Sequence, residues 1–133
     1  MTTAMSSLAI AASALLLVAI AFQLGLAAGA PWGRAAYGGR VALADGTLPV
    51  RHRAASLVTA AVLLVVGWVL LLRGGVLGTT AGHPGLSYAC WGFAALFALN
   101  TAGNVAGRHP LERWGMGALT ACLAVACVLL AVG

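Results

Sequence analysis

Charge is what this sequence lacks most. Only 7% of its 133 residues are charged: seven Arg, no Lys and two acids, Asp45 and Glu112. Soluble domains carry about 25% charged residues, so this chain cannot keep a water-soluble surface around a single core. The remaining composition is 62% hydrophobic, and the mean hydropathy is +1.04. These values together predict an integral membrane protein.

Groups that do chemistry are equally scarce. Two acids leave few general bases for catalysis, and no Ser, His and acid converge in the sequence. The histidines fall in the connections between apolar runs, so they form no facing pair for a haem, and the cysteines form no CxxC or zinc pattern. We therefore expect no enzyme, no catalytic residue, no metal and no cofactor. The residues concerned are His52, His83, His109, Cys90, Cys122 and Cys127; whether Cys90 and Cys127 pair is left open.

Long apolar runs are what the sequence has instead. Four of them, 8–28, 54–72, 85–106 and 114–132, carry almost no charge. Each is close to the ~20 residues with which an α-helix crosses the hydrocarbon layer, and none shows the alternation of a membrane barrel strand. The sequence predicts an all-α, four-helix bundle that forms one transmembrane domain over residues 1–133.

The Arg residues are distributed unevenly between the connections. Four lie between the first two runs and two between the last two, whereas only Arg73 lies at the middle connection. By the positive-inside rule, the connections 31–53 and 107–113 face the cytoplasm, and both termini face outward. The net charge of +5 then faces anionic headgroups of a bacterial plasma membrane rather than nucleic acid.

The two Arg-bearing connections also hold aromatic residues at the expected membrane surface. Connection 31–53 reads either as an interfacial loop or as a short re-entrant helix over 33–44 that floors a cavity. Glu112 falls in the first turn of the last helix, where we expect it to pair with Arg108 four residues earlier. The predicted interfacial residues are Trp32, Arg34, Tyr37, Arg40, Arg51, Arg53, Arg108, Arg113 and Trp114.

Polar residues of all four predicted helices fall at similar depth, about 5–10 Å from the cytoplasmic helix ends at a rise of 1.5 Å per residue. One interpretation is interhelical hydrogen bonding, supported by the four-residue spacing of Gly25 with Gly29 and of Gly103 with Gly107. The other is a vestibule that binds a polar headgroup or ion beneath aliphatic walls. This polar layer comprises Gln23, Ser56, Thr59, Asn100, Thr101, Asn104 and Thr120.

Three segments resemble a pattern found in small four-helix bacterial membrane proteins that have no established activity. They are GAPWGRAAYGGR (29–40), TLPVRHRAAS (47–56) and ALNTAGNVAGRHPLER (98–113). The specific features are the PWG loop and the paired Asn before the last connection. The resemblance implies a four-helix topology over nearly the whole chain and transfers no catalytic residue.

Two functional hypotheses follow from these observations. The first is a non-enzymatic structural or accessory subunit that associates with itself or with a larger membrane complex. The second is a channel or binding module for a small amphiphile or ion, with the polar layer as its vestibule. Direct bonding of both Asn amides without a cavity would favour the first, and a cavity with amides pointing into it would favour the second. In either case the expected partners are membrane lipids and another membrane protein.

Overall fold

The computed structural model describes residues 3–133 and is all-α within them. Its long helices are α1 (Thr3–Ala28), α2 (Val50–Arg73), α3 (Pro84–Val105) and α4 (Gly117–Val132). Short turns precede α2 and α4: the 3₁₀ turns η1 (Gly33–Ala35) and η2 (Tyr37–Gly39), and the π-helical turn η3 (Leu111–Met116). The described residues contain no strand, so the all-α prediction is confirmed.

Three segments are long and apolar enough to cross a membrane: Thr3–Ala28, Val50–Arg73 and Leu111–Val132. The sequence predicted a fourth span, but α3 is not among these three, although it has 22 residues. Polar side chains in its last two turns, Asn100 and Asn104 among them, lower its hydropathy. Large apolar side chains such as Leu17, Val65 and Trp68 are exposed on the bundle surface. Exposed apolar surface of this kind is typical of contact with a membrane, and together with the three long apolar segments it suggests a membrane protein.

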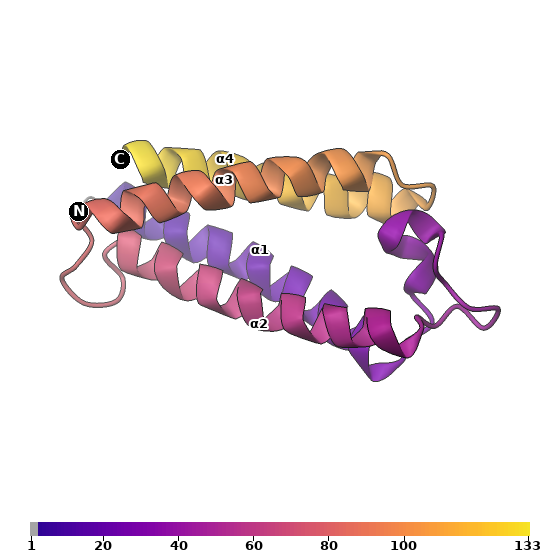
Figure 1. The fold of residues 1–133 in the computed structure, drawn as a ribbon. Coiled ribbons are helices and arrows are strands. Elements are labelled where there is room, and N and C mark those ends of the chain that lie inside the picture. Colours follow the sequence, from indigo (N-terminus) through magenta and orange to yellow (C-terminus); the bar gives the residue numbers. More distant parts are fainter. Residues whose placement is uncertain (1–2) are drawn as a thin grey trace.

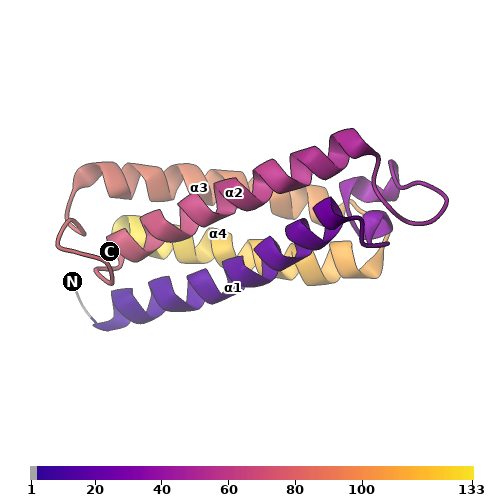
Figure 2. The same ribbon diagram turned by 90° about the horizontal axis from the view of Figure 1, so that it is seen from below.

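The helices are arranged as two hairpins (Figure 1). α1 packs mainly on α2 and α3 mainly on α4, with α1 and α4 supplying the closest contact between the hairpins. Small and branched side chains fill the core, including Ala9, Leu16, Leu70, Cys90 and Leu130. The hairpins diverge toward the end where segment 29–49 and the α3–α4 connection lie side by side (Figures 1 and 2). We call this the loop end and the opposite one the termini end.

A buried Arg closes the termini end. Arg73, 6% exposed, donates hydrogen bonds to the carbonyls of Leu130 (2.7 Å), Ala81 (2.7 Å) and Ala131 (3.4 Å). The last carbonyls of a helix lack intrahelical partners and carry negative partial charge, so Arg73 caps α4. Ser87 Oγ donates to the same Ala131 carbonyl at 2.6 Å.

Segment 29–49 forms a small folded cap on the loop end. Its interior is apolar: Leu48 and Ala36 pack on Leu26 at the end of α1. Backbone bonds, such as Gly33 N–H to the Gly46 carbonyl at 2.7 Å, close the loop. Segment 33–44 is therefore not one helix: it contains the two 3₁₀ turns η1 and η2, and residues 40–44 are irregular. α2 also begins at Val50, four residues before the expected start, because the charged residues after Pro49 continue the helix beyond the apolar run.

Candidate functional site: a polar cavity at the loop end

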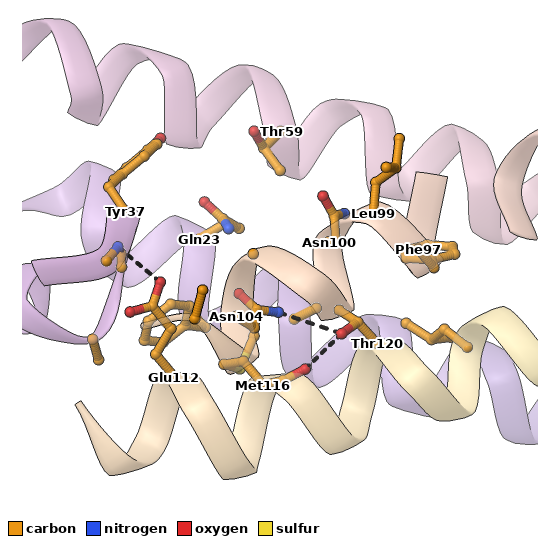
Figure 3. Close-up of a pocket in the computed structure, with 18 of the residues that line it drawn as sticks. Gln23, Tyr37, Thr59, Phe97, Leu99, Asn100, Asn104, Glu112, Met116 and Thr120 are labelled. Carbon is orange, nitrogen blue, oxygen red and sulfur yellow. Dashed lines mark hydrogen bonds between the residues drawn. The ribbon is translucent and has the colours of Figure 1, made fainter. Parts of the chain in front are cut away.

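A cavity of about 500 Å³ lies between the two hairpins, under segment 29–49. All four helices contribute to its wall, together with η2 and η3 (Figure 3). Its apolar wall includes Phe22, Leu63, Phe97, Leu123 and Met116. A cavity of this size falls in the range of small-molecule sites, which are mostly apolar with a few placed polar groups.

Five of the seven predicted polar-layer residues line this cavity: Gln23, Thr59, Asn100, Asn104 and Thr120. The other two lie outside its lining. Ser56 is fully buried and its Oγ has no hydrogen-bond partner. Thr101 Oγ1 lies within hydrogen-bond distance of both the Phe97 carbonyl (2.8 Å) and Thr120 Oγ1 (2.9 Å).

The two asparagines have different surroundings. Asn104 Nδ2 donates to Thr120 Oγ1 at 3.3 Å, which ties α3 to α4. Asn100 is exposed and lines the cavity, and its side-chain amide makes no hydrogen bond to any residue of the described chain. Figure 3 shows its amide directed into the space between α2 and α3, opposite Thr59. The packing interpretation thus fits Asn104, and the vestibule interpretation fits Asn100.

Glu112 is the only acid that lines the cavity. It is 3% exposed, and its Oε1 accepts a hydrogen bond from Gly38 N–H at 3.0 Å, whereas its Oε2 has no partner. The expected pair with Arg108 is therefore wrong: the side chain turns inward to segment 29–49 instead of along its own helix. Glu112 lies in the π-helical turn η3, and π-helical turns occur frequently at functional sites.

The backbone that faces Glu112 is unusual. Tyr37, Gly38 and Gly39 have positive φ values of 53°, 70° and 75°. Glycine adopts this region at little cost, whereas Tyr37 is strained there. The Tyr37 ring meets the His52 ring edge-on, with centroids 5.0 Å apart. This local conformation is what presents Gly38 N–H to the carboxylate, and strain of this kind often marks a binding site.

The glycines that suggested close helix packing have other roles. A Cβ at Gly25 would collide with the ring of Trp32, which stacks on Phe22 at 5.9 Å, and one at Gly107 would collide with Glu112 Oε2. Gly29 has a φ of 95° and ends α1 beside Arg53, and Gly103 faces open space. The interpretation of these glycines as helix–helix contacts is therefore wrong: Gly25 and Gly107 make room for side chains, Gly29 forms a turn of the chain, and Gly103 has no neighbouring helix in contact.

The predicted interfacial residues all lie in segments at the loop end, and several Arg side chains have specific partners. Arg53 Nε donates to the Ala27 carbonyl at 3.0 Å and so caps α1. Arg34 holds the Ala44 carbonyl at 2.9 Å, and the Arg113 guanidinium lies 5.2 Å from the Trp114 ring centroid. Arg40 is exposed and lines the cavity, so it contributes the one cationic side chain in the lining.

Sequence reasoning did not assign Glu112 to the cavity, whereas Tyr37 and Arg40 belong to the segment 33–44 that one of its alternatives expected to floor a cavity. The glycines of the YGG turn are a sequence signal for its positive φ values. No sequence signal identified Glu112 as the residue that this turn contacts, because Gly38 and Glu112 are 74 residues apart. Within residues 3–133, no group of three or more His, Cys, Asp or Glu side chains could hold a metal ion. Comparisons of the chain with known protein families, with curated proteins and with solved structures found no match.

Proposed function

We propose that this chain is a non-enzymatic integral protein of the bacterial plasma membrane that binds a small amphiphilic molecule in the loop-end cavity. The carrying observation is the composition of the wall, in which an unpaired Asn100 amide and a half-paired Glu112 carboxylate face the same cavity as Phe97 and Leu63. A polar head and an apolar tail match such a wall.

The topology follows from the Arg distribution. Six of the seven Arg residues lie at the loop end, and the exception, Arg73, is buried as a helix cap. By the positive-inside rule, this distribution supports a cytoplasmic position of the loop end and hence of the cavity. α3 completes the bundle as the fourth spanning helix through its packing on α4. Association with a second copy or with a larger complex stays a prediction.

Thiol labelling in oriented membrane vesicles tests this proposal. With Cys90, Cys122 and Cys127 replaced by Ala, we expect Asn100→Cys to react with a charged thiol reagent supplied from the cytoplasmic side only. The matched control is Leu96→Cys, on the same helix and exposed but outside the cavity lining, which lipid should protect. Absence of labelling at Asn100→Cys from both sides would refute a water-accessible cavity, and labelling from the outer side only would refute the topology.

A further inference from the structure

The cavity lining includes residues whose buried hydrogen-bond acceptors have no donor. Glu112 Oε2 and Gln23 Oε1 are buried atoms without a partner. Asn104 uses its amide nitrogen on Thr120, so its carbonyl oxygen remains an acceptor. Buried acceptors without donors cost free energy until a donor meets them, so the wall is suited to a guest that donates several hydrogen bonds.

The charge of Glu112 further restricts the chemical class of the guest. A carboxylate that is 3% exposed and has one unpaired oxygen attracts a cation strongly, because the surroundings of low polarity screen it little. A primary ammonium group carries positive charge and three N–H donors and no acceptor. Neither an alcohol nor a carboxylate matches that combination.

The Arg residues nearby do not cancel this preference. Arg53 and Arg34 are bound to backbone carbonyls, and Arg40 is exposed at the cavity lining, where water and salt screen charge over about 8 Å. No Arg donates a hydrogen bond to Glu112, whose one donor in the described chain is Gly38 N–H. His52 borders Tyr37 through its ring edge and is not part of the cavity lining.

Resting on the proposed function, we infer that the guest of this cavity is a primary-amine amphiphile whose ammonium group binds Glu112, with Gln23 and Asn104 as further acceptors. The apolar wall formed by Phe97, Leu63 and Leu123 takes the alkyl portion. Gly107 leaves the room that Glu112 Oε2 occupies, and η3 sets the turn on which the carboxylate lies.

The test uses three water-soluble probes of equal chain length: hexylammonium, hexanol and hexanoate. The reporter is Leu99→Cys, at the exposed edge of the cavity, in the full chain with its native cysteines replaced by Ala and reconstituted in lipid nanodiscs at pH 7. The measurement is how far each probe slows modification by a neutral methanethiosulfonate reagent, which does not consume amines.

We expect hexylammonium to protect at a concentration about tenfold below that of hexanol. A hydrogen bond to a charged group contributes more free energy than a neutral one by about the 1.4 kcal/mol that corresponds to a tenfold change in affinity. Hexanoate should protect least. Glu112→Gln should remove the preference for the amine, and Glu112→Asp should retain it in part. The matched control is Asp45→Asn, which removes the other acid, outside the cavity lining, and should leave the preference unchanged.

The outcomes separate the two proposals. Equal protection by hexylammonium and hexanol in the chain with Glu112 intact, or an amine preference that survives Glu112→Gln, would overturn the amine inference while the cavity still binds amphiphiles. Protection by none of the three probes would overturn the binding function as well. Because the first comparison needs no change at Glu112, it stands even if Glu112→Gln folds poorly.

Discussion

Each end of the bundle buries one charged side chain, and the two side chains differ in how completely they are hydrogen-bonded. At the termini end, Arg73 donates hydrogen bonds from all three guanidinium nitrogens to backbone carbonyls. At the loop end, Glu112 has one donor, an unpaired oxygen and a cavity beside it. Fully paired buried charges hold structure together, whereas half-paired ones beside a cavity are candidates for binding. We therefore interpret the buried charge at the termini end as structural and propose that the one at the loop end serves binding.

The largest effect is expected from Arg73→Met. The substitution leaves the buried carbonyls of Leu130 and Ala81 without donors, and we expect the free energy of unfolding to fall by at least about 3 kcal/mol. Denaturant titration in detergent measures this. Arg53→Met is the matched control, because Arg53 caps α1 with a single bond and is half-buried; it should cost about half as much. An equal decrease in the free energy of unfolding for both variants would mean that Arg73 stabilises the fold no more than an ordinary helix cap does.

Gly107→Ala should have the next largest effect. The added Cβ collides with Glu112 Oε2, and overpacking of this kind costs about 1–3 kcal/mol. Glu112→Ala removes the obstructing atom, so the double variant should show a coupling of about 1 kcal/mol or more in a double-mutant cycle. Gly103→Ala, on α3 with open space around it, should instead stabilise the helix by about 0.5–1 kcal/mol. Additive effects of Gly107→Ala and Glu112→Ala would mean that the two residues do not share this space.

The contrast between the ends also explains what the sequence could predict. The helices follow from apolar runs of suitable length, and the cavity-lining Gln23, Asn100 and Asn104 follow from counting residues inward from the charged connections. Such counting uses information local to one helix. Leu130 lies 57 residues from its donor Arg73, and Gly38 lies 74 residues from Glu112. The choice of Gly38 over Arg108 depends on the tertiary position of segment 29–49. Local helix rules favoured Arg108, and the tertiary contact prevailed.

A smaller effect is expected from Glu112→Gln. The amide oxygen still accepts from Gly38 N–H, and the unpaired buried charge is gone, so the free energy of unfolding should change by less than about 1 kcal/mol. The same titration that measures Arg73→Met tests this. A loss as large as that of Arg73→Met would mean that Glu112 has a structural role equal to that of Arg73, which would end the distinction between the two buried charges.

The smallest effect concerns Asp45, the second acid of the loop end, which is exposed and accepts two hydrogen bonds from Thr47 at its Oδ1. Hydrogen bonds from the Thr47 hydroxyl at 2.7 Å and from Thr47 N–H at 3.0 Å hold the pKa of Asp45 below its usual value of 3.8. A lowered pKa in the folded state stabilises the fold at neutral pH. That contribution persists down to the unfolded pKa near ~3.9 and disappears as the pH falls through the lower folded value.

The check on Asp45 is a pH series of thermal unfolding for the unsubstituted chain and for Asp45→Asn. The unsubstituted chain should unfold at a slightly higher temperature at neutral pH, and the gap should close below pH ~4. Thr47→Val removes the hydroxyl donor and should narrow the gap at neutral pH in the same direction. A difference in unfolding temperature that stays constant with pH would show that Asp45 acts through something other than its charge. The contrast drawn between Asp45 and Glu112 would then not hold.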